Sequence, residues 1–285
     1  MPVPDSDVAA LETIALDKRY RRVHALSECS FSLPSGRIAA LAGPNGAGKS
    51  TLMDLIAGIR RPTGGEIRVL GTSSRSFSGI HPDVSYLAQR KPLYRSFTVE
   101  EMLKAGHKLN DRWDAEYARR LVEQAGLTPK AKVSTLSGGQ RSRLAIAMAL
   151  GRRPAVLLLD EPLAELDPFA RREVSHALLD EVRNQGTTVL MSSHIVADLQ
   201  GMCDYLLCLV SGRLVLDGPV EELLGAHRVR REPDLDGAAG STVSPVVEAA
   251  PASPETEWRA PTLEELVLSR MAPPPHGTYV RAVSS

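Results

Sequence analysis

Residues 43–51, which read GPNGAGKST, constrain this chain more than any other stretch. They match Gly-x-x-x-x-Gly-Lys-Ser/Thr, the pattern of a phosphate-binding P-loop. The run before the loop, 37–42, is short and mostly apolar, which favours a buried parallel strand. Apolar residues from Leu52 to Ile59 recur at helical spacing, which predicts a helix that begins near Lys49. Strand, glycine-rich loop and helix, in this order, predict a site for the phosphates of a nucleotide.

The residue types in the loop suit that chemistry. Three glycines allow the backbone to curl so that several N–H groups point at one anion. The helix N-terminus adds its partial positive charge. Lys49 is predicted to reach the β- and γ-phosphates, and Ser50 to ligate Mg²⁺. The predicted nucleotide-binding residues of the loop are Gly43, Pro44, Asn45, Gly46, Ala47, Gly48, Lys49, Ser50 and Thr51.

Two further motifs indicate which kind of nucleotide-binding protein this is. LSGGQ occupies residues 136–140, and VLLLDE occupies residues 156–161. Together with the P-loop they resemble the ATP-binding-cassette (ABC) ATPases in order and spacing. The resemblance implies an α/β fold with a P-loop NTPase core, a mostly parallel sheet and an N-terminal antiparallel β subdomain. It also implies a helical subdomain at about 90–150, a nucleotide-binding domain over 1–224, and ATP and Mg²⁺ as cofactors.

The resemblance also assigns catalytic and metal-binding roles. It implies that Asp160, with Ser50 and Gln89, holds Mg²⁺ directly or through water. Glu161 would polarise the hydrolytic water as general base, a role that contributes roughly 10²–10⁴-fold in typical enzymes. Gln89 would touch the attacking water, and His194 would donate to the γ-phosphate.

The LSGGQ segment predicts a second anion site. Ser137 and Gln140 have the Ser-x-x-Gln spacing of a capping box, so a helix is expected to begin there. The N–H groups beside Gly138 and Gly139 would then face an anion. In the family that this chain resembles, two cassettes pack head to tail, and the signature of one closes on the γ-phosphate held by the other. The resemblance therefore implies ATP contacts by Ser137, Gly138, Gly139 and Gln140 across a dimer.

Two other positions follow the family pattern. Tyr20 lies ahead of the P-loop where the family places an aromatic residue that stacks on adenine. Asp167, followed by Pro168, suits the start of a helix and resembles the D-loop at the dimer contact. Glu165 departs from the small residue that is more common at its position, and no function is assigned to it.

Composition bounds the partners. The 285 residues include 34 Lys and Arg against 34 Asp and Glu, a net charge of +0, so nucleic acid is not expected as a partner. Cys29, Cys203 and Cys208 are not at metal-ligand spacing, and they favour a reducing compartment. The first ten residues lack the apolar region of a signal peptide, and no run reaches the length of about 18 apolar residues that a membrane span needs. Any membrane role is expected to require a partner.

The C-terminal part changes character. Residues 225–260 are rich in Pro, Ala, Ser and Glu without a period and predict a flexible linker. Residues 261–285 predict a capped helix with an apolar stripe and then a disordered tail. The helix is similar to one in bacterial drug- and polysaccharide-export ATPases. That it packs on its own domain is an equally good interpretation.

These features favour an ATP-hydrolysing subunit that powers an ABC transporter, with export as the expected direction. The expected partners are an integral-membrane permease and a second ATPase subunit, identical or not. The expected location is cytoplasmic, at the inner face of the membrane through the permease. One alternative is a soluble ABC ATPase in translation, DNA repair or cofactor assembly, against which the single cassette, the lack of a coiled coil and the balanced charge all count. Another is a regulatory module without turnover, which the presence of Glu161, Gln89 and His194 disfavours.

Overall fold

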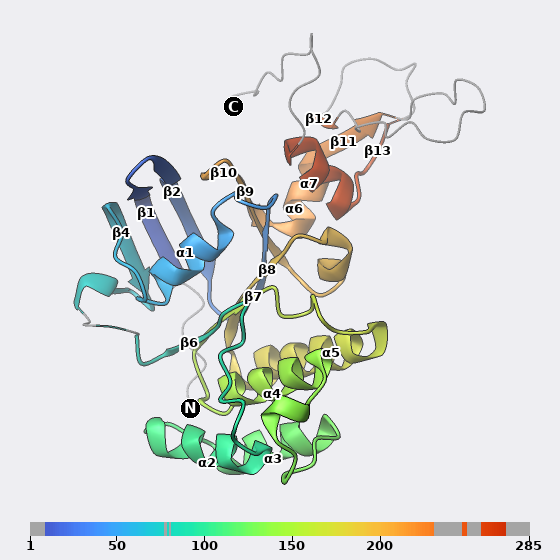
Figure 1. The fold of residues 1–285 in the computed structure, drawn as a ribbon. Helices are drawn as coiled ribbons and strands as arrows, with labels where there is room; N and C mark the ends of the chain where they lie inside the picture. Colours follow the sequence, from blue (N-terminus) through green and yellow to red (C-terminus); the bar gives the residue numbers. More distant parts are fainter. Residues whose placement is uncertain (1–8, 77–78, 80, 231–246, 250–257, 272–285) are drawn as a thin grey trace.

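Two sheets form the body of the protein in the computed structural model, which describes residues 9–76, 79, 81–230, 247–249 and 258–271 (Figure 1). The four-stranded sheet has the order β2-β1-β4-β5, and the six-stranded sheet has the order β10-β9-β3-β8-β7-β6. The strands of the first sheet are β1 (Ala9–Tyr20), β2 (Val23–Pro34), β4 (Gly64–Val69) and β5 (Thr72–Ser73). The strands of the second are β3 (Ile38–Ala42), β6 (Val84–Leu87), β7 (Val156–Asp160), β8 (Thr188–Ser193), β9 (Tyr205–Val210) and β10 (Arg213–Pro219).

The strand directions place the candidate functional residues at one edge of the six-stranded sheet. In the six-stranded sheet β6, β7, β8, β3 and β9 are parallel, and only β10 runs antiparallel, to β9. In the four-stranded sheet all pairings are antiparallel. Because the carboxyl ends of parallel strands share an edge, the segments that follow β3, β6, β7 and β8 all emerge there. These segments carry Gly43, Gln89, Glu161 and His194.

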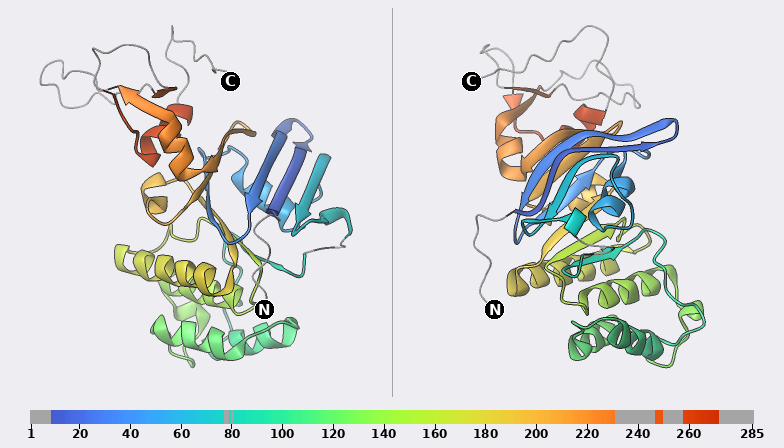
Figure 2. Two further views of the ribbon diagram at one scale, coloured as in Figure 1. Left: turned by 180° about the vertical axis from the view of Figure 1, so that it is seen from behind. Right: turned by 90° about the vertical axis from the view of Figure 1, so that its left-hand side faces the viewer.

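The helices lie on both faces of the six-stranded sheet and at one end of the molecule (Figure 2). Helices α2 and α3 lie farthest from the four-stranded sheet, with α4 and α5 between them and the six-stranded sheet (Figures 1 and 2). The helices are α1 (Lys49–Ile56), α2 (Val99–Leu109), α3 (Ala115–Gln124), α4 (Gly138–Leu150), α5 (Pro168–Gln185), α6 (Val220–Ala226) and α7 (Leu263–Met271). The short 3-10 helices are η1 (Ser74–Ser76), η2 (Val133–Thr135) and η3 (Val196–Leu199).

Both faces of the six-stranded sheet are buried, and its strands alternate between two cores. Leu158 of β7 packs with α1 and the four-stranded sheet, whereas its neighbours Leu157 and Leu159 pack with α4 and α5. All three leucines have no exposed surface, and full burial of such a side chain is worth about 1.5–3 kcal/mol. The α/β fold class expected from the sequence, with its mostly parallel sheet and antiparallel β subdomain, is confirmed.

The C-terminal region differs from the expectation of a flexible linker over 225–260. Three short strands form an antiparallel sheet there: β11 (His227–Arg230), β12 (Val247–Ala249) and β13 (Trp258–Arg259). The pairing of these strands joins segments far apart in the chain, so no local sequence pattern predicts it. Residues 231–246 and 250–257 of the expected linker, and the expected disordered tail over 272–285, lie outside the described residues.

Helix α7 packs on its own domain. Leu266 and Val267 are fully buried in the same core cluster as Leu199 of η3 and Cys208 of β9. Of the two interpretations of this helix, the structure shows the internal one. The helix begins at Leu263, within the capped start that the sequence predicts at 261–265.

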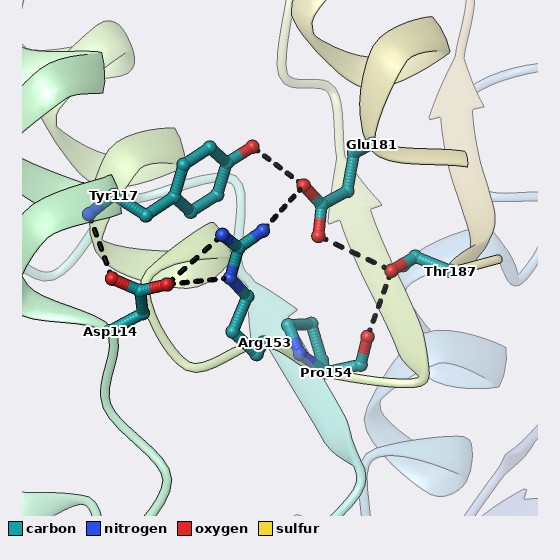
Figure 3. Close-up of polar contacts among 6 residues, drawn as sticks. All are labelled: Asp114, Tyr117, Arg153, Pro154, Glu181 and Thr187. Carbon is teal, nitrogen blue, oxygen red and sulfur yellow. Dashed lines mark hydrogen bonds and ion pairs between the residues drawn. The ribbon is translucent and has the colours of Figure 1, made fainter. Parts of the chain in front are cut away.

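A polar network joins the helical end of the molecule to the sheet (Figure 3). Arg153, in the loop between α4 and β7, donates twice to Asp114 at 3.0 and 3.1 Å and once to Glu181 of α5 at 3.3 Å. Its guanidinium lies 3.6 Å from the ring centre of Tyr117, whose hydroxyl donates to Glu181 at 2.6 Å. Thr187, just before β8, donates to the other oxygen of the same carboxylate. One guanidinium thus connects α3 to α5 and, through Glu181, to the start of β8.

Candidate nucleotide-binding site

The glycine-rich loop after β3 has the backbone that phosphate binding requires. Gly43, Gly46 and Gly48 have φ values of 151°, 81° and 108°, a region that side chains disfavour. A Cβ on Gly43 would lie 2.3 Å from the carbonyl oxygen of Leu209. Gly48 caps α1, which begins at Lys49 as the sequence predicts. The loop therefore curls over the N-terminus of a helix.

Lys49 lies inside the curl of the loop. Its Nζ donates to the carbonyl oxygens of Gly43 at 2.6 Å and Pro44 at 3.2 Å, and the residue is only 7% exposed. Burial lowers the pKa of Lys49, and the nearby carboxylates of Glu161 and Asp160 offset part of that effect. An ammonium held this way is placed to exchange carbonyl oxygens for phosphate oxygens.

A cavity of about 630 Å³ opens in front of the loop. It brings together residues from five places in the chain, most of them predicted from the sequence. The predicted residues that line it are Tyr20, Asn45, Gly46, Ala47, Gly48, Lys49, Ser50, Thr51, Gln89, Asp160 and Glu161. The cavity has room for a bound nucleotide beside the loop.

Sequence reasoning missed part of the cavity wall. Val23, His24 and Ala25 come from the start of β2, and Ser211 and Gly212 come from the turn between β9 and β10. That turn also supports the P-loop, because the N–H of Gly212 donates to the carbonyl oxygen of Ala47 at 3.0 Å. No short motif marks these residues, since the packing of the two sheets brings them to the loop.

Tyr20 forms one side of the cavity at the end of β1. Lys18 Nζ lies 5.0 Å, and Arg60 Cζ 5.6 Å, from its ring centre. Tyr20 is half-buried, and cations at these distances are attracted to the face of an aromatic ring.

The acidic residues after β7 are held by β8. Ser192 Oγ donates to Asp160 Oδ1 at 2.6 Å and accepts from the N–H of Glu161 at 2.9 Å. Glu161 has a φ of 51°, an uncommon backbone for a residue with a side chain. Its Oε2 lies 2.8 Å from Nδ1 of His194. Ser192 was not singled out from the sequence, although it bonds to the carboxyl group of Asp160 and to the backbone of Glu161.

The donor set of the cavity fits a magnesium ion. Ser50, Gln89 and Asp160 line one cavity and offer hydroxyl, amide and carboxylate oxygens, which are ligands that Mg²⁺ accepts. Within the described ranges, no cluster of three or more His, Cys, Asp or Glu suits a metal by itself. The nucleotide and water would therefore have to supply further ligands.

The LSGGQ segment lies elsewhere. Ser137 Oγ accepts from the N–H of Gln140 at 3.2 Å, and Gln140 Oε1 accepts from the N–H of Ser137 at 2.9 Å, so the predicted capping box forms. Among the described residues that line the cavity, none comes from 137–140. The expected ATP contacts of Ser137, Gly138, Gly139 and Gln140 thus do not form within one copy of the chain.

Asp167 begins α5 in the same way. Its Oδ1 accepts from the N–H of Ala170 at 2.9 Å, and this backbone hydrogen bond lowers the pKa of the carboxyl group. The next residues are surface-exposed, and Phe169 is 72% exposed.

Comparison with known proteins agrees with this geometry. The family model described as ABC transporter matches residues 26–164. The chain is 38% identical over 204 residues to the thiamine import ATP-binding protein of Rhizobium meliloti strain 1021, a match that covers 70% of this chain and 85% of that protein. A solved structure of the ATP binding subunit of an ABC transporter is similar with a TM-score of 0.69 and 28% identity, covering 75% of this chain and 91% of that one.

Two longer relatives match with similar identity. The putrescine transport ATP-binding protein of Escherichia coli strain K12 is 34% identical, and the match covers 80% of this chain and 62% of that protein. The Nod factor export ATP-binding protein I of Neorhizobium galegae is also 34% identical, and the match covers 76% of this chain and 65% of that protein. Among relatives whose names give a direction, import is more frequent than export.

Proposed function

The chain belongs to the ABC transporter family of ATP-binding subunits, which are ATPases, and we propose that it binds ATP with Mg²⁺ and hydrolyses it to power a transporter whose permease is a separate chain. The observation that carries the proposal is the single cavity in which the P-loop lysine meets Gln89, Asp160 and Glu161. The match spans only 62% of the putrescine relative's length, so the activity of the whole protein is part of the proposal.

The P-loop would bind and orient the phosphates. Its N–H groups and the N-terminus of α1 face the anion, and Lys49 Nζ leaves the carbonyl oxygens of Gly43 and Pro44 for the β- and γ-phosphates. Tyr20 would stack on adenine at the other end of the cavity. Bound Mg²⁺ supplies charge neutralisation at the phosphates.

Glu161 would act as the general base toward water. Its hydrogen bond with His194 fixes the direction of the carboxylate, and Ser192 fixes its backbone. Preorganised groups of this kind cost no rearrangement at the moment of reaction. His194 would also donate to the γ-phosphate, and Gln89 would touch the attacking water.

A second ATPase subunit would complete the site. The signature residues 137–140 form a capped helix start outside the cavity, where they have no role toward this chain's own phosphates. Head-to-tail packing of two subunits would bring this anion site to the γ-phosphate of the partner. The exposed Phe169 beside Asp167 supplies apolar surface for such a contact.

The permease would place the protein at the inner face of the membrane. None of the helices in the described ranges has the length and apolar character of a membrane span. Relatives named as transport proteins favour this function over a soluble ATPase in translation, DNA repair or cofactor assembly. The relatives do not support the export direction that the C-terminal helix suggested, and export is not part of the proposal.

Co-purification tests the coupling to a permease. The tagged Glu161→Gln variant is recovered from detergent-solubilised native membranes with and without ATP, with Lys49→Ala as the control that lacks the phosphate contact. We expect a membrane-spanning protein in near-equal amount with Glu161→Gln. Recovery of ribosomes, nucleic acid or only the tagged chain would contradict a transporter subunit and leave the ATPase chemistry standing.

A further inference from the structure

An ion pair outside the described chemistry joins two turns of the site. Lys91 Nζ lies 3.2 Å from Glu165 Oε2. The side chain of Lys91 is only 6% exposed, whereas that of Glu165 is 52% exposed. A buried ammonium requires a partner that offsets its lost hydration, and in the part of the chain that the structure describes Glu165 is the carboxylate within ion-pair distance.

Lys91 closes the turn that presents Gln89. Its N–H donates to the carbonyl oxygen of Ala88 at 2.9 Å, so Gln89 occupies the second position of a four-residue turn after β6. Lys91 has a φ of 45°, a backbone that a residue with a side chain adopts only when its surroundings hold it. The position of Gln89 in the cavity therefore depends on how Lys91 is held.

Glu165 lies in the turn that joins Glu161 to α5. It follows Glu161 by four positions and precedes the α5 cap Asp167 by two. Its Oε2 would lie 3.1 Å from a Cβ placed on Gly138, so the carboxylate also rests against the first turn of the signature helix α4. A carboxylate near a helix N-terminus is favoured by the helix dipole.

We propose that Lys91 and Glu165 form a positioning pair that holds Gln89 in a fixed position relative to Glu161 and to the start of α4. The pair fixes the Gln89 turn, at the end of β6, to the Glu161 turn, at the end of the neighbouring strand β7. Neither residue of the pair lines the cavity, so the pair acts through Gln89 and Glu161, which do. The inference rests on the proposed ATPase function, because it assigns Gln89 a part in holding Mg²⁺.

The burial of Lys91 predicts an unusual order of effects. Glu165→Gln leaves a buried ammonium without its counter-charge, which displaces the turn. Lys91→Met removes the charge and keeps the length of the side chain. The double variant Lys91→Met/Glu165→Gln has no buried charge to satisfy, so it is expected to be more active than Glu165→Gln alone. Lys91→Arg keeps the charge and serves as the conservative variant.

The test uses the full chain and measures ATP turnover, the Mg²⁺ concentration for half-maximal turnover, and Mg²⁺-dependent binding of a fluorescent ATP analogue. For Glu165→Gln we expect turnover to fall about tenfold and the required Mg²⁺ to rise about threefold, as small displacements of positioning groups do. The turnover of the double variant is expected to be at least about threefold higher than that of Glu165→Gln, because the two effects are coupled. Lys91→Arg is expected to stay near the wild type.

Glu100→Gln is the matched control, since it breaks the exposed Lys104–Glu100 pair at 2.8 Å on α2. It is expected to change neither turnover nor the Mg²⁺ requirement. Thermal midpoints identify variants that lose activity by unfolding. An unchanged Mg²⁺ requirement in Glu165→Gln, or losses that multiply in the double variant, overturns the positioning pair. A wild-type chain that neither binds nor hydrolyses ATP instead overturns the proposed function, and the inference with it.

Discussion

His194 Nδ1 lies 2.8 Å from Glu161 Oε2, and the two residues follow the neighbouring parallel strands β8 and β7. The side chain of Glu161 is 8% exposed, whereas that of His194 is 45% exposed. The histidine therefore covers a nearly buried carboxylate and sets its direction. This contact supports the proposed role of Glu161 as general base.

Glu161→Gln is expected to abolish turnover and keep ATP binding. The amide occupies the same volume and can still meet His194, but it accepts no proton, so turnover should fall by about 10²-fold or more. Phosphate release measures turnover, and a fluorescent ATP analogue measures binding. Glu173→Gln, which breaks the ion pair between Glu173 and Arg143, is the control. Wild-type turnover in Glu161→Gln would refute the assigned base.

Ser192→Ala is expected to lower turnover without preventing folding. The change removes the hydrogen bond to Asp160 at 2.6 Å and the acceptor for the N–H of Glu161 at 2.9 Å. The Asp160 carboxyl group and the Glu161 backbone each lose a partner, so we expect turnover to fall by about 10-fold and more Mg²⁺ to be required. Ser175→Ala, which removes a hydroxyl bonded to its own helix, should leave both quantities unchanged. Equal behaviour of the two variants would remove Ser192 from the site.

Gly48→Ala is expected to damage the P-loop far more than Gly36→Ala. Both glycines have positive φ, 108° and 70°, so both changes carry a backbone cost of about 1 kcal/mol. At Gly48 the new Cβ would also lie 2.6 Å from the carbonyl oxygen of Ala25, whereas at Gly36 nothing lies within 4 Å. The free energy of unfolding measured in urea and the affinity for ATP should both be lower for Gly48→Ala than for Gly36→Ala. A similar loss in both would mean that the loop can move aside.

Asp114→Asn tests the network around Arg153 through its pH dependence. Asparagine is as good a helix cap as aspartate, so the change removes mainly the charge that faces Arg153. The hydrogen bond from the Tyr117 N–H, followed by contact with Arg153, lowers the pKa of Asp114 in the folded protein. A lowered carboxyl pKa contributes stability above the unfolded value of about 3.9 and loses it as the pH falls.

We therefore expect the wild type to be more stable than Asp114→Asn at pH 7, and the difference to shrink as the pH falls below about 4. Urea unfolding at a series of pH values measures it. Asp111→Asn, in the same loop before α3, is the control. A difference that does not depend on pH would show that the charge of Asp114 contributes nothing.

Short-range patterns predicted local structure well. The Ser-x-x-Gln spacing forms the predicted reciprocal capping box, at Ser137 with Gln140. The start of α1 at Lys49 was also predicted. Each of these depends on residues within four positions of one another, so the local sequence specifies them. The resemblance to ABC ATPases and the ATPase class are confirmed, whereas the exporter-like branch is not supported by the relatives.

The sequence by itself determined the P-loop, the buried strand before it and the capped helix starts, because these follow from residue type and close spacing. Only the tertiary structure decided that Ser192 orients Asp160, that Gly212 supports the P-loop, and that β11–β13 form a sheet. It also paired Lys91 with Glu165, 74 positions apart. Contacts of this kind depend on the register of parallel strands and on how two cores pack against one sheet. That register is set by burial summed over the whole domain, so no window of the sequence contains it.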